Sequence, residues 1–402
     1  MSATKLKTQF HPVSVELSDG VLTRLSSLCP SEGTEYAVLP GFCDVHVHLR
    51  QPGFSYKETV YTGTRAAAAG GFTAICSMPN LNPVPDSEEN IKLQQQIIDL
   101  DSVINTYPYA SITVAQKGEK LSDMEALAPH CIAFSDDGKG IQSTEMMLSA
   151  MKKAKALGKM IVAHCEDESL LEGGYIHKGS YCQRHGHRGI SSESEYAQIK
   201  RDIELLRETG VKYHVCHVSA AESIRAIREA KKEGLDITCE TAPHYLILTD
   251  EDLKEDGRFK MNPPLRSAED RDELIKGICD GTVDMIATDH APHSAEEKSR
   301  GLEKSVFGIV GLETCFPLMY THFVKTGIIT TEKLVELMAI NPRKRFGIPL
   351  SKEDLCVWDL NAQIKVDPQK FQSMGRATPF EGERLYGKAI LTLCGGRTVH
   401  KA

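Results

Sequence analysis

Short apolar runs and longer periodic stretches alternate along the chain from residue 41 onward. Runs rich in apolar and β-branched residues, such as "GFTAICSMP" and "KMIVAHCE", are typical of strands buried on both faces. The stretches that follow them, such as "SEENIKLQQQIIDL", repeat apolar residues at the spacing of an amphipathic helix. The pattern indicates eight strand–helix units over about 300 residues, with "ASITVAQ" and "CIAFSDD" as the expected third and fourth strands.

Eight consecutive strand–helix units predict an α/β protein of the (β/α)8 TIM-type barrel class, which typically needs ~250 residues plus insertions. We place this barrel at residues 41–348. An open, doubly wound parallel sheet is the structural alternative. It is the weaker one, because no G-x-G-x-x-G motif follows the first strand.

The two ends of the chain follow a different pattern. Residues 1–40 and 349–402 alternate polar and apolar positions, as in "VSVELSDGVLTRL" and "CVWDLNAQIKV", and they contain glycine at the expected turns. This alternation is typical of half-buried strands. We expect the N- and C-terminal segments to pair into one small β-domain beside the barrel.

Bulk composition excludes several classes of protein. The chain has 402 residues, of which 41% are hydrophobic and 25% charged, and a net charge of −8, which is ordinary for a globular protein. It has no basic run interleaved with aromatic residues, so no nucleic-acid partner is predicted. No apolar run approaches the ~18 residues of a membrane span, and the N-terminus lacks the apolar core of a signal peptide. The twelve cysteines are scattered without a C-x-x-C motif, which indicates reduced core residues and a cytoplasmic location.

Candidate chemistry lies where the predicted strands end, which is where barrel enzymes carry their active sites. The first strand ends in "DVHVHLR", where His46 and His48 are two residues apart and therefore on one face of the strand. Arg50 is the next residue in that series. Other strand ends carry further imidazoles and carboxylates: Asp136 and Asp137, His164, His217, and Asp289.

Four histidines and two carboxylates at one rim predict a metal site, because these side chains are ligands of Zn²⁺ and similar ions. Six ligands are too many for one tetrahedral ion and suit two. Two metals ~3.5–4 Å apart can hold a hydroxide at neutral pH and polarise a carbonyl, which is equipment for attacking amides and esters. Asp289, on the eighth strand, is then placed to take the proton of the nucleophile and pass it to a leaving nitrogen.

Polar residues near these ligands suggest the substrate. Arg50 follows the two histidines, Asn80 closes "SMPN", Asn262 lies in "KMNPPLR", and His293 follows in "TDHAPH". Together they suit a small planar ligand with a carboxylate and imide-like edges, since a guanidinium pairs with a carboxylate in a bidentate manner. Ordinary loop hydrogen bonding is the alternative for each. Four other histidines fall in loops or off the rim and receive no role: His177, His185, His187 and His244.

The motif set resembles that of dihydroorotases, in particular the bacterial branch of this cyclic-amidohydrolase family with an aspartate in the fourth strand. The resemblance runs from about residue 40 to the C-terminus. It rests on these motifs: "DVHVHLRQPG", "SMPN", "SDDGKG", "VAHCE", "YHVCHVS", "KMNPPLR" and "IATDHAPHS". The motifs "DVHVHLRQPG" and "KMNPPLR" separate dihydroorotases from hydantoinases and allantoinases, which share the barrel and the H-x-H.

The resemblance implies zinc-dependent reversible hydrolysis of (S)-dihydroorotate to N-carbamoyl-L-aspartate in pyrimidine biosynthesis, by attack of a metal-bound hydroxide. It implies two zinc ions per subunit, one held by His46 and His48 and the other by His164 and His217. Asp137 would bridge the ions. Many relatives in the superfamily use a carboxylated lysine from the fourth strand for that purpose, and Lys139 is the rival bridge here.

The resemblance also implies roles around the metals. Asp289 would be a metal ligand and the general acid/base, and Arg50, Asn80 and His293 would hold the substrate carboxylate. Asn262, with backbone groups near Phe307 and Gly308, would contact the ring. The stretch "SAEEKSRGLEKSVFG", residues 294–308, would be a mobile active-site loop, for which a plain solvated loop is the alternative.

Two other functions compete with this one. A related amidohydrolase that opens hydantoin or allantoin would share the metals, but Arg50 and the two asparagines argue against it. An inactive homologue acting as a structural partner of aspartate transcarbamoylase should have lost metal ligands, and all six are present. Association of an active enzyme with that partner, and a homodimer, stay open. The N-terminal segment is shorter than in many members of the family, which puts the completeness of the small β-domain in doubt.

Overall fold

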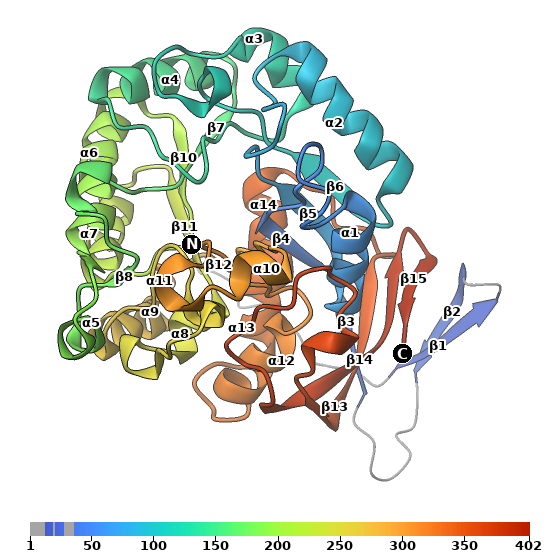
Figure 1. Cartoon of the computed structure of the whole chain (residues 1–402). Helices are drawn as coiled ribbons and strands as arrows, with labels where there is room; N and C mark the ends of the chain where they lie inside the picture. Colours follow the sequence, from blue (N-terminus) through green and yellow to red (C-terminus); the bar gives the residue numbers. More distant parts are fainter. Residues whose placement is uncertain (1–12, 19–20, 28–35) are drawn as a thin grey trace.

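A computed structural model describes residues 13–18, 21–27 and 36–402 of the chain. Part of the predicted N-terminal segment, including residues 1–12 and 28–35, lies outside the described residues. The described chain is an α/β structure with an antiparallel sheet at one side (Figure 1). None of the helices in the described ranges is long and apolar enough to cross a bilayer.

Parallel strands form two sheets that follow the predicted apolar runs. The first sheet has the order β4-β5-β6, with β4 at Phe42–Val47, β5 at Phe72–Ser77 and β6 at Asn105–Pro108. The second has the order β12-β11-β10-β7. Its strands are β7 (Met160–Ala163), β10 (Lys212–Val215), β11 (Ile237–Thr241) and β12 (Met285–Ile286).

Single parallel bridges lie between the two sheets. Phe134 bridges to Ala110 on one side and to Ile161 of β7 on the other, and Val47 of β4 bridges to His290, which follows β12. The expected fourth strand "CIAFSDD" therefore pairs with both neighbours in the described chain, but through isolated bridges and not as a continuous strand. Backbone hydrogen bonds still join this segment to both neighbours, and the Asp136 carboxylate at its end accepts further backbone N–H groups from the segment after β6.

The expected third strand is displaced toward the N-terminus. β6 ends at Pro108, and part of the expected strand "ASITVAQ" forms the short helix η1 at Val114–Gln116. Ala115 and Gln116 both have a φ of 51°. The N–H of Ala115 donates to the Asp86 carboxylate at 2.8 Å instead of to a strand. Local side-chain bonding of this kind competes with sheet formation.

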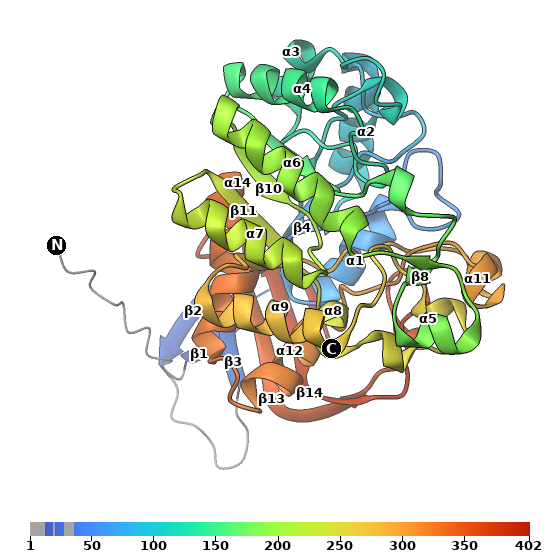
Figure 2. The same cartoon turned by 90° about the vertical axis from the view of Figure 1, so that its left-hand side faces the viewer.

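Helices follow the strands and lie on the outside, with α6, α7 and α9 side by side (Figure 2). α7 shows why they form: Ile224 and Ile227 face the core, and Lys231 and Lys232 stand in the last turn, where cations suit the helix dipole. The longer helices are α1 (Val60–Ala69), α2 (Glu88–Asp101), α4 (Thr144–Ala156), α6 (Glu193–Thr209), α7 (Ala221–Lys232) and α9 (Ala268–Asp280).

Shorter elements fill the connections. They are α3 (Met124–Leu127), η2 (Ala128–His130), η3 (Glu168–Leu170), β8 (Ile176–His177), α5 (Ser180–His185), β9 (Gly189–Ile190), α8 (Pro243–Ile247), η4 (Asp250–Asp252), η5 (Gly257–Phe259), α10 (Ala295–Lys298) and α11 (Gly301–Lys304). After the last parallel strand come α12 (Cys315–Met319), η6 (Tyr320–Val324), α13 (Thr331–Val335), η7 (Glu336–Ile340) and α14 (Asn341–Phe346).

Segments from both ends of the chain share one antiparallel sheet of order β1-β2-β15-β14-β13-β3. Trp358 of β13 is buried and packs against the rings of Phe42 and Phe316, which joins this sheet to the parallel one. A single residue, Gly41, separates the end of β3 from the start of β4. The strands are β1 (Val13–Ser18), β2 (Val21–Ser27), β3 (Tyr36–Pro40), β13 (Leu355–Lys365), β14 (Arg384–Cys394) and β15 (Arg397–Lys401), with η8 at Pro368–Lys370.

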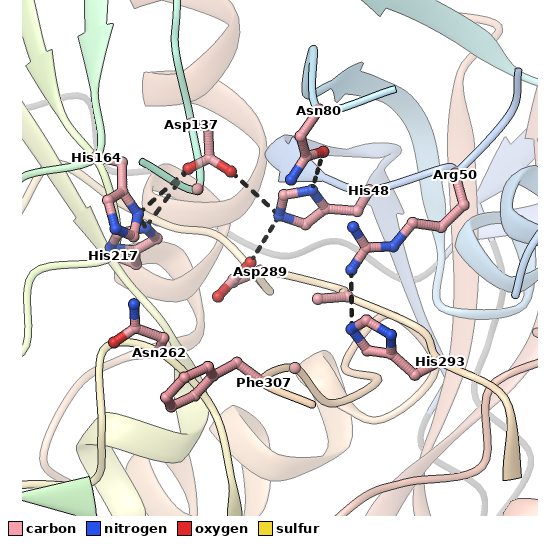
Figure 3. Close-up of a pocket in the computed structure, with 13 residues that line it drawn as sticks. His48, Arg50, Asn80, Asp137, His164, His217, Asn262, Asp289, His293 and Phe307 are labelled. Atoms are coloured by element: carbon pink, nitrogen blue, oxygen red, sulfur yellow. Dashed lines mark hydrogen bonds and ion pairs between the residues drawn. The ribbon is translucent and has the colours of Figure 1, made fainter. Parts of the chain in front are cut away.

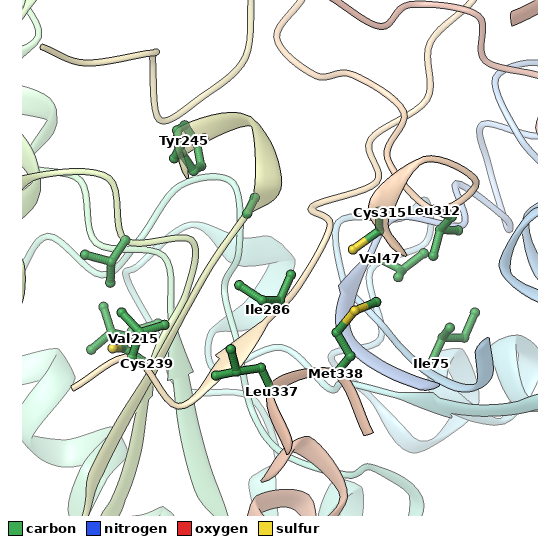
Figure 4. Packing of buried hydrophobic residues seen from close by; sticks show 14 of the residues in the cluster. Val47, Ile75, Val215, Cys239, Tyr245, Ile286, Leu312, Cys315, Leu337 and Met338 are labelled. Carbon is green, nitrogen blue, oxygen red and sulfur yellow. The ribbon is translucent and has the colours of Figure 1, made fainter. Parts of the chain in front are cut away.

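The core lies on both faces of the parallel strands. A smaller cluster of buried residues comes largely from the strands themselves, including Cys43, Val45, Cys76 and Met285. A larger cluster joins strands to helices: it includes Val47, Ile75 and Ile286 of the strands and Leu337 and Met338 of η7, and Figure 4 shows Leu337 beside Ile286. Burial on both faces explains the near-continuous apolar runs. It also leaves the strand ends as the places where polar side chains can gather.

Candidate metal centre and substrate pocket

The end of β4 brings two buried imidazoles against one carboxylate. His46 Nε2 lies 3.3 Å from Asp137 Oδ1, and His48 Nε2 lies 3.5 Å from Asp137 Oδ2. The two rings are 5.3 Å apart, so they converge as the same-face spacing predicts. β4 itself ends at Val47, and Arg50 has a φ of 61°. Arg50 therefore reaches the same pocket through a left-handed turn, not as the next residue of a regular strand.

Asp137 lies between this pair and a second pair of histidines, and Figure 3 shows it between His48 and the second pair. Asp137 Oδ1 is 3.6 Å from His164 Nδ1, after β7, and 3.6 Å from His217 Nε2, after β10. His217 has a φ of 30°, in the left-handed region that is rare for a non-glycine residue. Backbone strain of this kind concentrates at functional sites.

Asp289 joins the first pair from the end of β12. Its Oδ1 lies 3.2 Å from His48 Nε2 and 3.5 Å from His46 Nε2. It also has a left-handed φ, 47°. Asp137 therefore lies between the two histidine pairs, and Asp289 lies beside the first pair.

These side chains fit metal cations. His46 Nε2, Asp137 Oδ1 and His164 Nε2 are buried and have no hydrogen-bond partner among the described residues. Their ligand atoms fall into two groups that share Asp137, and within each group the atoms lie within 4.8 Å of one another: His46, His48 and Asp137, and Asp137, His164 and His217. Orphaned buried nitrogen and oxygen atoms are costly unless a cation or hydrogen bond compensates them. Imidazole and carboxylate together are a zinc-type donor set.

Electrostatics favour positive charge between the carboxylates. Burial alone would raise the pKa of Asp137, but His46 and His164 outweigh it and hold that pKa well below its usual range. Likewise, burial of Asp289 is outweighed by His46 and His48, so its pKa is also lowered. Both carboxylates are therefore ionised at neutral pH. The two negative charges favour a positive charge on the neighbouring imidazoles, and a bound metal ion could supply that charge in place of protons.

Glu240 of β11 supports the first histidine from behind and was not found from the sequence. Its Oε1 lies 2.7 Å from His46 Nδ1, and its Oε2 lies 3.0 Å from His214 Nε2. Burial raises the pKa of Glu240, but these hydrogen bonds from His214 and His46 outweigh it and lower the pKa to about 2. Carboxylates behind metal-ligating histidines commonly set the ring orientation. The available signal was the charged residue near the C-terminal end of the strand-like run "ITCET".

The predicted residues border one cavity of about 200 Å³. All of the predicted site residues except His46 line it. The lining is His48, Arg50, Asn80, Asp137, Gly138, His164, His217, Asn262, Asp289, Ala291, His293, Phe307 and Gly308. Lys139, the rival bridge, is exposed and is not part of this lining in the described chain.

Several polar groups on the cavity wall already form hydrogen bonds with other groups of the protein. Asn80 Oδ1 lies 2.8 Å from His48 Nδ1, so this amide also orients a histidine. Asn262 donates to Glu166 Oε2 at 3.2 Å, while its buried Oδ1 has no partner among the described residues. Arg50 Nε donates to the Pro292 carbonyl at 3.2 Å. Burial lowers the pKa of Arg50 to about 10, so it is still a cation at neutral pH.

The segment 294–308 is structured. It contains α10 and α11 and buries Lys298 and Leu302. Lys298 Nζ donates to the carbonyls of Lys260 at 3.0 Å and Val306 at 2.8 Å, which ties the segment to the chain just before Asn262. The segment 294–308 is therefore not a plain solvated loop. Its closure over a bound ligand stays a prediction.

Known proteins resemble this chain along nearly all of its length. A family model described as "Dihydro-orotase-like" matches residues 36–223. A dihydroorotase of Fusobacterium nucleatum is 54% identical, with 98% of this chain and 96% of that protein aligned. The chain belongs to the dihydroorotase family. A dihydroorotase of Bacillus caldolyticus is 50% identical over 90% of this chain and 87% of that protein.

Solved structures of related enzymes share the fold of this dihydroorotase family member. The L-hydantoinase of Arthrobacter aurescens matches with a TM-score of 0.83 at 26% identity, covering 97% of this chain and 92% of that one. A dihydropyrimidinase of Brevibacillus agri matches with a TM-score of 0.81 at 23% identity, covering 97% and 91%. The family prediction is confirmed, and the likeness to hydantoinases is a likeness of fold.

Proposed function

We propose that the chain is a dihydroorotase, which reversibly hydrolyses the cyclic amide of (S)-dihydroorotate to N-carbamoyl-L-aspartate in pyrimidine biosynthesis. The observation that carries the proposal is the 54% identity with a protein of that name over nearly the full length of both chains. The cavity supports it, because the histidine–aspartate cluster, Arg50 and His293 all lie on its border or directly behind it.

We further propose two zinc ions per chain. His46 and His48 would hold one, His164 and His217 the other, and Asp137 would contact both. Asp289 would complete the first site. When bound, the zinc pair supplies a hydroxide nucleophile at neutral pH and polarises the amide carbonyl.

The remaining steps belong to side chains of the protein. Asp289, ionised and beside the first histidine pair, would take the proton of the nucleophile and deliver it to the ring nitrogen as the amide bond breaks. Arg50 and His293 would hold the substrate carboxylate, with Asn80 nearby. Asn262 Oδ1 is available to accept an N–H of the ring, and Phe307 and Gly308 form the adjoining wall.

For the architecture, we propose that the parallel strands and their bridges close into a (β/α)8 barrel spanning residues 41–348. The bridges from Phe134 to both neighbours and from Val47 to His290 support this closure. Residues 1–40 and 349–402 would form the small β-domain, in keeping with the shared antiparallel sheet.

A comparison of substrates tests the function. The purified protein should contain about two zinc ions per chain by elemental analysis and should open dihydroorotate much faster than hydantoin. Hydantoin lacks the carboxylate that Arg50 and His293 would bind. Equal rates on both compounds would favour the hydantoinase alternative, and no activity on either with both metals present would refute the proposal.

A further inference from the structure

His293 lies between two cations that can only donate hydrogen bonds. Its Nε2 is 3.3 Å from an Arg50 guanidinium nitrogen, and its Nδ1 is 3.2 Å from Lys57 Nζ (the Arg50 contact is drawn in Figure 3). The imidazole side chain is 8% exposed. Burial and the charges of Arg50 and Lys57 lower the pKa of His293, which keeps the ring neutral.

A neutral imidazole has one acceptor nitrogen and one N–H donor. It can therefore accept from Arg50 or from Lys57, but not from both. One of the two contacts must bring an N–H against a cationic donor, which is unfavourable in a buried site. The conflict disappears when an anion lies between Arg50 and Nε2, because the anion accepts from both.

We infer that Lys57 holds His293 as the tautomer with its proton on Nε2, and so prepares the ring to donate to the substrate carboxylate. The inference rests on the proposed function, which supplies the carboxylate. Lys57 donates to Nδ1, Nε2–H points toward the cavity, and Arg50 provides the second donor. Lys57 is not part of the cavity lining in the described chain, so it acts through His293 as a positioning residue.

Lys57 is itself held in place. Its Nζ forms an ion pair with Glu297 Oε1 at 2.9 Å and lies 5.5 Å from the ring centres of Phe54 and Tyr56. Glu297 is fixed by a capping box, in which its Oε2 accepts from the backbone N–H of Ser294 at 3.0 Å. The ammonium is thus confined on the side of His293 away from the cavity.

The arrangement contains one competitor. Glu297 Oε2 lies 3.6 Å from His293 Nδ1, and it could attract a proton on Nδ1 if the lysine were absent. Removal of the ammonium should therefore shift the ring toward the opposite tautomer. That tautomer presents a bare nitrogen, and not a donor, to a carboxylate in the cavity.

The test is Lys57→Met in the zinc-loaded enzyme. We expect KM for dihydroorotate to rise about 10-fold, the effect of losing one hydrogen bond to a charged group, while kcat changes less than about twofold. Lys57→Arg should restore KM, since arginine also donates and is charged. Lys92→Met removes a lysine of an exposed ion pair on α2 and serves as the matched control with unchanged KM.

Nitrogen-15 spectra of the histidine rings give a readout that a structural role would not move. The His293 signal is identified by its loss in His293→Gln, and it should report a proton on Nε2 in the wild type and on Nδ1, or exchanging between the two, in Lys57→Met. An inactive wild type would refute the proposed function, whereas the tautomer measurement would still test Lys57. An active wild type with the same KM and the same tautomer in Lys57→Met, or a loss of kcat and melting temperature that Lys57→Arg does not restore, would overturn the inference.

Discussion

The glutamate behind His46 offers the sharpest test of how the candidate metal centre is built. Glu240 accepts from His46, from His214 and, at 3.3 Å, from the backbone N–H of His217. In Glu240→Gln the amide keeps the size of the side chain and one acceptor oxygen. His214 can accept the new N–H, because Thr238 Oγ1, 2.8 Å from its Nδ1, can serve as donor or acceptor. The substitution therefore removes mainly the negative charge.

The size of the effect follows from that loss of charge. A hydrogen bond to a charged acceptor contributes ~1.5–3 kcal/mol, and one between neutral groups ~0.5–1.5 kcal/mol. The difference for the His46 contact is about 1–1.5 kcal/mol, or about 10-fold in an equilibrium constant. We therefore expect zinc binding to weaken about 10-fold, at the lower end of the ~10–100-fold range for groups that support metal ligands.

The assay is competition for zinc with a chromophoric chelator, carried out on the wild type and Glu240→Gln. The weaker of the two sites should be the one that includes His46, so the variant should lose one ion per chain first. Glu313→Gln is the matched control, since this partly buried glutamate accepts from the backbone of Gln372 and Ser373, outside the metal-binding groups found in the described residues. Zinc affinity within twofold of the wild type in Glu240→Gln would refute the reasoning.

Other substitutions probe separate parts of the molecule. Asp289→Asn should lower kcat by about 10²–10⁴-fold at an unchanged melting temperature, and near-normal turnover in a kinetic assay would remove Asp289 from proton transfer. Asp137→Ala should lower zinc content toward one ion per chain by elemental analysis, whereas Lys139→Ala should keep both; a carboxylated Lys139 between the ions in a crystal structure would reverse this assignment. Arg50→Lys should raise KM for dihydroorotate with zinc content intact, because lysine lacks the bidentate fork, and an unchanged KM would contradict carboxylate binding by Arg50. Burial raises the pKa of Glu313 from 4.5 to about 7. Between pH 4.5 and about 7 the folded state therefore binds more protons than the unfolded state, and the free energy of unfolding falls as the pH rises through this range. Thermal denaturation should find Glu313→Gln more stable than the wild type above pH 7, with a difference that shrinks as the pH falls to about 4.5; a difference independent of pH would argue against this.

The strand ends could be predicted because two local rules sufficed. Buried parallel strands are continuous apolar runs, and the polar residues that interrupt them at the C-terminal ends point to one rim. His164, His217 and Asp289 follow these rules and line the cavity. The fourth strand is only partly regular, because its backbone pairs with both neighbours through isolated bridges and its last hydrogen bonds are made by the Asp136 side chain, which apolar periodicity does not reveal.

The supporting residues could not be predicted from spacing. Glu240 meets His46 across 194 positions of the chain, and Lys57 meets His293 across 236. Glu240 lies near the C-terminal end of β11 and Lys57 lies in the loop before α1, and in both cases only the three-dimensional structure shows which histidine each side chain contacts. Arg50 was predicted for the site, but through a same-face strand series that its positive φ rules out.

The direct passage from β3 into β4 has a consequence for synthesis on the ribosome. β4 pairs with β5, about 30 residues later, whereas Pro40 of β3 pairs with Leu355 of β13, about 315 residues later. At ~5–20 residues per second, the partner of β3 emerges about 16–60 s after β3 itself. During that time β3 has no partner strand although it is attached to the strand that carries His46, and unpaired strand backbone promotes aggregation. A nascent or truncated chain that lacks β13 would therefore expose the backbone N–H and C=O groups through which β3 pairs with it.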